Sequence, residues 1–147
     1  MPVRKAIPQK DGIYFITFTC ARWLPLFEIT NGYSFVYKWF DILKKTGHYI
    51  IGYTIMPSHV YAIIAFRNTG KTINSIIGNA KRFMAYDLVA ALEEQHQSII
   101  LNQLKDWVNK TQQSENKQHE VFEPSFDRKP AWRQTGNAEQ KSLLSKN

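Results

Sequence analysis

The residues best placed to do chemistry are a histidine and a tyrosine two positions apart, His59 and Tyr61. They follow Met56-Pro57-Ser58, which separates two runs of β-branched and aromatic residues, so 49–66 predicts two strands joined by a tight turn. Side chains alternate between the faces of a strand, so His59 and Tyr61 point to the same side and could share one ligand. An imidazole can hold a metal ion, whereas a phenol with a pKa of about 10 is a poor ligand at neutral pH. A single strand histidine is more often packed or hydrogen-bonded, and we favour that structural role for His59.

A second group of residues fits contact with a polyanion. The chain carries 19 Lys and Arg against 12 Asp and Glu, a formal charge of +7, and 14% of its residues are aromatic. Basic side chains neutralise phosphates and aromatic rings stack on unpaired bases, so nucleic acid is the expected partner. Any one of these residues could simply be a solvated charge or a packed ring, so the prediction depends on all of them together. The set is Trp23 for base stacking and, for phosphates, Arg22, Lys71, Lys81, Arg82, Arg128 and Lys129.

The elements that must position these residues follow from hydrophobic periodicity. Alternation predicts a first strand, and apolar residues three and four apart predict helices. In chain order we expect a strand over 12–22, a helix from Thr30 or Asn31 to Thr46, the strand pair, helices over 72–94 and 99–108, and a last strand over 120–126. We expect the buried stripe of the first helix to be Phe35, Trp39, Ile42 and Leu43. This order predicts a ferredoxin-like α+β sandwich, an antiparallel sheet of about four strands with helices packed on one face.

The length and composition of the chain limit the kind of protein that it can be. A length of 147 residues predicts one domain, which we place at 12–129, between a basic N-terminal arm at 1–11 and an irregular tail at 130–147. The single cysteine, Cys20, excludes an internal disulfide and fits a reducing compartment. No apolar run approaches the roughly 20 residues of a membrane span, and 1–10 lacks the apolar core of a signal peptide. We therefore expect a cytoplasmic protein without membrane contact.

Four blocks of the chain resemble one protein family. Met-Pro-Ser-His-Val-Tyr at 56–61 resembles the Met-Pro-Asn-His-Val-His of the HUH transposases of the single-tyrosine type, which include the REP-associated tyrosine transposases. The segments 14–27, 81–87 and 121–127 are similar to the first strand, second helix and last strand of these proteins. The blocks stand in the right order and span roughly 12–129, and together they are more specific than any one of them.

The resemblance implies a chemistry and a partner. Family members bind hairpin DNA and adjoining single strands, and they cut single-stranded DNA when a tyrosine attacks a backbone phosphate. A divalent cation, Mg²⁺ or Mn²⁺, held by two strand histidines absorbs the negative charge of the transition state. The resemblance therefore implies hairpin or single-stranded DNA as the partner of this chain.

This sequence departs from the family pattern twice. Tyr61 stands at the second histidine position, so we expect much weaker metal binding and no bound cation, with His59 as the one candidate ligand. Tyr86 is the last tyrosine, so nothing after the final strand can act as the family's nucleophile, and 130–147 resembles a truncated or frame-shifted end. Neither Tyr61 nor Tyr86 is a good substitute, since attack needs the reacting atoms in line at about 3 to 3.5 Å. We expect a catalytically inactive, transposase-like DNA-binding protein.

Two other readings stay open at this point. One is an active enzyme whose site is completed by a partner protomer, as in a homodimer that shares residues between subunits. The other is an RNA-binding or adaptor module on the same fold, in which the aromatic strand from Tyr14 to Phe18 stacks bases.

Overall fold

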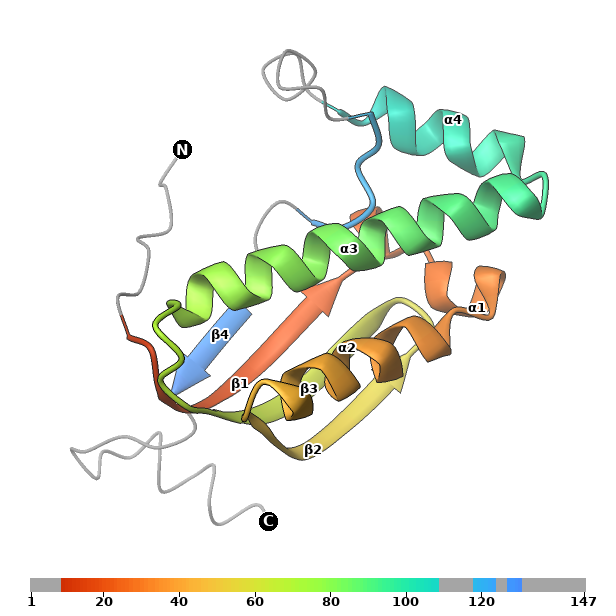
Figure 1. Cartoon of the computed structure of the whole chain (residues 1–147). Helices are drawn as coiled ribbons and strands as arrows, with labels where there is room; N and C mark the ends of the chain where they lie inside the picture. Colours follow the sequence, from red (N-terminus) through yellow and green to blue (C-terminus); the bar gives the residue numbers. More distant parts are fainter. Residues whose placement is uncertain (1–8, 109–117, 124–126, 131–147) are drawn as a thin grey trace, which may run out of the picture.

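Four antiparallel strands form the sheet, in the spatial order β2-β3-β1-β4 (Figure 1). The computed structural model describes residues 9–108, 118–123 and 127–130, the last range as backbone apart from Pro130. The strands are β1 (Gly12–Thr19), β2 (Tyr49–Met56), β3 (His59–Phe66) and β4 (Asp127–Pro130). The two central strands are β1 and β3, so residues on β3 lie near the middle of the sheet.

The hairpin forms where the sequence predicts it. β2 ends at Met56 and β3 begins at His59, so the connection is the two-residue turn Pro57-Ser58. The pairing is regular along β3 and shifts between Ile50 and Gly52 of β2, where one extra residue bulges from the edge strand.

The helices lie on one face of the sheet (Figure 1). They are α1 (Leu26–Thr30), α2 (Tyr33–Lys45), α3 (Ile73–Glu94) and α4 (Ser98–Asp106). Thr72 caps α3, because its hydroxyl oxygen accepts a hydrogen bond from the Ser75 N–H at 3.1 Å. The ferredoxin-like sandwich is thereby confirmed, with helices on one side of the sheet; no described helix covers the other side, which we call the open face.

The first predicted helix is in fact two helices. Asn31 has a φ of +53° in the left-handed region, which ends α1, and α2 starts afresh at Tyr33. Asparagine tolerates this conformation better than most residues, so Asn31 caps the C-terminus of α1 instead of the N-terminus of the next helix.

Burial along the strands follows the predicted alternation. In β1 and β3 the even-numbered residues face the helices, and they form the core with the inner faces of α2 and α3. The predicted stripe of α2 is partly wrong: Ile42 is 51% exposed, while Val36, Trp39, Phe40 and Leu43 are buried. The helix is rotated so that Phe40 rather than Ile42 meets the sheet, where it packs on Tyr53 with ring centroids 5.0 Å apart.

The last strand lies later than predicted. Residues 120–123 form no strand and pair with the sheet only through a bridge between Cys20 and Phe122. The backbone hydrogen bonds of this segment are divided between α4 and the end of β1, since the Glu120 N–H donates to the Leu104 carbonyl at 2.9 Å and the Glu123 N–H to the Thr19 carbonyl at 2.8 Å. The ladder along β1 is instead completed by β4.

Some predictions fall outside the described residues. These are most of the N-terminal arm (1–8), the tail from 131 onward, part of the predicted last strand (124–126), and the side chains of Arg128 and Lys129. Within the described ranges, no helix combines the length and the apolar character needed to cross a membrane.

Candidate nucleic-acid interface

His59 and Tyr61 lie together on the open face of the sheet, on the side that the alternation predicts. In the ladder His59 stands opposite Thr19 and Tyr61 opposite Thr17, so both side chains are flanked by threonines of β1. Tyr61 is 45% exposed, whereas Val60 between them is buried beneath the helices. A ligand approaching the open face therefore meets the imidazole and the phenol side by side.

Each of the two rings has an aromatic neighbour. The edge of His59 meets Trp23, with ring centroids 5.3 Å apart, and Ser58 Oγ lies 3.4 Å from His59 Nδ1. Tyr61 meets Phe15 of β1 in a similar edge-on contact at 6.3 Å. We call these four residues, Phe15, Trp23, His59 and Tyr61, the aromatic strip. His59 is thus packed and hydrogen-bonded within the protein, which fits the structural role favoured for it.

Trp23 is displayed by a strained turn. Arg22 and Trp23 have φ values of 51° and 62°, in a left-handed region that costs residues other than glycine roughly 1–2 kcal/mol each. The turn is held because the Trp23 N–H donates to the Cys20 carbonyl at 2.9 Å, and the Cys20 N–H donates to the Ser58 carbonyl at 2.8 Å. The indole at its tip is 64% exposed. Strain and an exposed ring coincide here, a combination typical of functional loops.

Arg22 and Lys81 lie next to this turn and are positioned by Glu123. The Arg22 guanidinium stacks over the Trp107 ring at 4.4 Å, and the Arg22 N–H donates to Glu123 Oε2 at 2.8 Å. The Lys81 ammonium donates to the Glu123 carbonyl. Two of the predicted phosphate contacts therefore meet at one end of β1, close to Trp23.

The other predicted contacts lie apart from this cluster. Arg82 bonds Asn79 at 3.3 Å on the outer surface of α3, and Lys71 lies just before α3, near the far end of β3. Arg128 and Lys129 belong to β4, opposite Ile16 and Phe15 in the ladder. Of the predicted set, the structure thus links Arg22 and Lys81 through Glu123, and it places Trp23, which follows Arg22, against His59.

The donor set at His59 does not fit the divalent cation that the resemblance implies. Among the described residues no three His, Cys, Asp or Glu side chains are grouped so that they could hold a metal ion. Near His59 the structure provides one imidazole and the hydroxyl groups of Ser58 and Tyr61. Hard divalent cations prefer several carboxylate or carbonyl oxygens, so this set of side chains would hold such an ion poorly.

Tyr86 lies on the other side of the sheet from His59. It is 62% exposed on the solvent side of α3, in edge contact with Phe83 at 6.2 Å. The sheet separates it from the open face (Figure 1). Tyr86 and His59 therefore cannot act on one phosphate within a single protomer.

Three contacts of this region are not predicted by the sequence. Phe15 lies in the strand from Tyr14 to Phe18 that the sequence offers for base stacking, but its contact with Tyr61 follows only from the register of β1 against β3. Trp107 and Glu123, which hold Arg22, lie far from it in the sequence, and although Glu123 stands in the 121–127 block that resembles the family, nothing in that block indicates a contact with Arg22. For these two no local signal exists.

Comparisons with known proteins bear on the fold. No protein-family model matches the sequence, and no curated protein matches it either. Among solved structures, the chain is similar to a REP-associated tyrosine transposase bound to a REP hairpin, with a TM-score of 0.58 and 12% identity over 99% of this chain and 68% of that one. It is also similar to a protein of Deinococcus radiodurans R1 assigned as a transposase, with a TM-score of 0.53 and 14% identity over 98% of this chain and 94% of that one. The chain has the fold of these proteins.

Proposed function

We propose that this chain is a transposase-like protein of the single-tyrosine HUH type that binds hairpin-bearing or single-stranded DNA without cutting it. The observation that carries the proposal is the exposed Trp23 beside His59 and Arg22, on a fold shared with a transposase solved in complex with a REP hairpin. Trp23 stacks on an unpaired base next to the duplex, because an exposed indole is a strong and sequence-tolerant stacking surface. Arg22 and Lys81 contact the phosphates on either side of that base.

The absence of catalysis is part of the proposal. An HUH site needs two histidines, and Tyr61 takes the place of the second. A phenol does not replace an imidazole as a ligand, so a cation would not be fixed against the phosphate. Binding is therefore independent of divalent ions beyond their effect on ionic strength.

A binding titration tests the DNA half of the proposal. Full-length protein is titrated with a single strand that carries a hairpin, with an unstructured strand of equal length, and with an RNA of the same sequence. We expect the hairpin DNA to bind most tightly. The affinity should fall steeply with salt, with a log–log slope of about −0.7 to −0.9 per phosphate neutralised. Equal binding of all three, or a salt-independent affinity, contradicts the proposal.

An adduct assay tests the catalytic half. The protein is incubated with labelled hairpin DNA and Mn²⁺ and run on a denaturing gel, where a phosphotyrosine link would retard the protein. We expect no adduct. An adduct that disappears in Tyr61→Phe or Tyr86→Phe shows that the chain is active. Sedimentation of the same complex distinguishes one protomer from a homodimer per hairpin.

One observation favours RNA as a second candidate ligand. Phe15 and Tyr61 lie on the two central strands of an open four-stranded sheet, an arrangement with which sheet-based RNA-binding modules stack bases. Tighter binding of the RNA strand in the titration, lost in Phe15→Ala, favours this alternative over DNA.

A further inference from the structure

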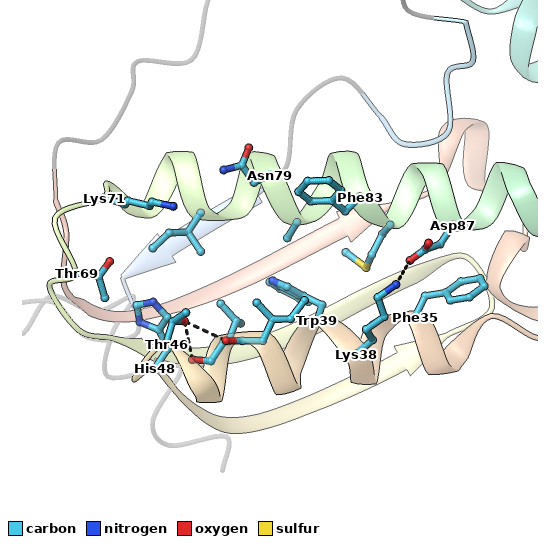
Figure 2. A pocket seen from close by; sticks show the side chains of 15 residues that line it. Phe35, Lys38, Trp39, Thr46, His48, Thr69, Lys71, Asn79, Phe83 and Asp87 are labelled. Carbon is cyan, nitrogen blue, oxygen red and sulfur yellow. Dashed lines mark hydrogen bonds and ion pairs between the residues drawn. The ribbon is translucent and has the colours of Figure 1, made fainter.

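A hollow lies between α2 and α3, on the helix-covered side of the sheet (Figure 2). Its volume is about 500 Å³, within the roughly 300–1,000 Å³ that small-molecule sites usually have. Its walls include two large apolar side chains that are more than half exposed, Ile42 at 51% and Phe83 at 56%. We call this hollow the interhelical groove.

The groove contains a buried hydrogen-bond donor with no acceptor. Trp39 projects from α2 into the space between the helices and is 5% exposed, with its ring stacked on Phe18 at 5.2 Å. Its Nε1 has no hydrogen-bond partner within the described part of the chain. Leaving a buried donor unpaired costs about 1–3 kcal/mol, and such groups are rare in native proteins. A phenylalanine would fill much of the same space without this cost, so the indole N–H calls for an acceptor in the groove.

The charges at the two ends of the groove differ. At one end the Lys38 ammonium is paired with Asp87 Oδ2 at 3.1 Å. At the other end Lys71 has no ion-pair partner among the residues that the structure describes. That end therefore carries the uncompensated positive charge.

His48 adds a second donor near Lys71. Its Nδ1 accepts a hydrogen bond from the Arg67 N–H at 3.1 Å, so the proton of the neutral ring is on Nε2. Burial, and then the charge of Arg67, lower the pKa of His48, which keeps the ring neutral at pH 7. His48 and Lys71 line the same end of the groove, so each can offer a donor there (Figure 2).

We propose that the interhelical groove binds a small amphipathic carboxylate. The carboxylate lies at Lys71 and His48, the apolar body lies between α2 and α3, and an oxygen on that body accepts from the Trp39 N–H. This gives Lys71 a role separate from the phosphate contacts near Trp23. The proposal does not depend on DNA binding, because the groove and the aromatic strip are on opposite faces of the sheet.

The test uses decanoate, decanol and 6-oxodecanoate, below their aggregation limits, with full-length ¹⁵N-labelled protein. The Trp39 indole N–H resonance, identified by its loss in Trp39→Phe, is followed during each titration. We expect it to shift saturably with decanoate, and we expect decanol to bind at least five-fold more weakly. Because its keto oxygen can accept a hydrogen bond from the Trp39 N–H, 6-oxodecanoate should bind roughly three- to ten-fold more tightly than decanoate.

Two variants show which side chain of the groove causes each of these differences in affinity. Lys71→Gln should remove the preference for decanoate over decanol, whereas Lys45→Gln, an exposed lysine outside the groove, should preserve it. Trp39→Phe should remove the advantage of the keto compound, measured by calorimetry. If Trp39→Phe does not fold, the Lys71→Gln comparison still decides whether the groove selects a carboxylate.

Three results would overturn the proposal. One is the absence of a saturable shift at Trp39. Another is equal affinity for decanoate and decanol in the unmodified protein. The third is a parallel shift of the Trp23 indole, which reports general adsorption to apolar surface. Hairpin DNA binding is measured in the same samples, so failure of this proposal is distinguished from failure of the DNA-binding proposal.

Discussion

Alternate residues of β3 point to opposite faces of the sheet, and the two sets differ in burial. Val60, Ala62, Ile64 and Phe66 are at most 4% exposed and pack beneath the helices. Their neighbours on the open face include His59 and Tyr61, which contact other rings at their edges and remain accessible. β1 repeats the arrangement, with Phe18 inside and Phe15 outside.

The comparison separates residues that stabilise the fold from residues that are available for binding. A residue on the helix-covered face is fixed by many contacts, so a change there alters the free energy of unfolding. A residue on the open face has few contacts to lose, so a change there alters what the surface can bind. Substitutions on each face can test this division.

Truncation of a core ring should have the largest effect. Phe18 is 1% exposed and stacks on Trp39, so Phe18→Ala should lower the free energy of unfolding by about 3–5 kcal/mol. Phe15→Ala on the same strand should cost roughly 1 kcal/mol. Urea unfolding followed by circular dichroism gives both values. Similar losses for the two variants would mean that the open face is not free for binding.

Removal of the Trp23 indole should affect binding without affecting stability. Trp23→Gly should weaken hairpin DNA binding by about 5- to 160-fold, the equivalent of the roughly 1–3 kcal/mol of one stacked base. Its unfolding free energy should change by less than about 1 kcal/mol, since glycine relieves the left-handed φ while the contact with His59 is lost. Trp23→Phe is the matched control and should retain most of the affinity. A wild-type affinity in Trp23→Gly would exclude stacking by Trp23.

A single substitution on the open face should create a metal site. Tyr61→His places two imidazoles on one side of β3, and nitrogen ligands bind Ni²⁺ and Co²⁺ well. We expect the apparent Ni²⁺ affinity at pH 7.5 to rise about ten-fold or more over the unmodified chain, measured by calorimetry. Tyr61→Phe should not change it. Tight binding by the unmodified chain would show that Tyr61 or a further group is already a ligand.

The pH dependence of stability should reveal a smaller contribution from His48. Its folded pKa lies below the ordinary 6.5, so below about pH 6.5 the unfolded chain binds more protons than the folded one. Stability should be constant above about pH 7 and should decrease as the pH falls through 6.5. His48→Asn, whose amide oxygen can still accept from the Arg67 N–H, should flatten this decrease in thermal melts between pH 5 and pH 8. The pKa of His119 is also lowered, mainly by burial, so His119→Gln is needed to separate its contribution to the pH dependence from that of His48.

The sequence predicts most of the fold because periodicity and turn chemistry are local. The hairpin around Pro57, the long helix capped by Thr72 and the order of the elements agree with the structure. The errors lie where tertiary contacts decide. Asn31 divides one predicted helix by its left-handed backbone, and 120–123 give their hydrogen bonds to α4 and the end of β1 instead of forming a strand.

The site is less predictable, because its parts come from distant segments. Alternation alone places His59 and Tyr61 on one face. The contact between Trp23 and His59 needs the turn after β1 to fold back over the hairpin, and the support of Arg22 needs Trp107 and Glu123. None of these pairings leaves a spacing pattern in the sequence.

The burial of Cys20 has a practical consequence for spectroscopy. Its thiol is fully enclosed, and this burial raises its pKa to about 12, so almost no reactive thiolate exists at neutral pH. A maleimide dye or spin label should therefore leave the folded native chain unmodified. A cysteine introduced at Thr17 or Thr54 could then carry the label alone, so distances from the open sheet to a bound strand could be measured without first removing Cys20.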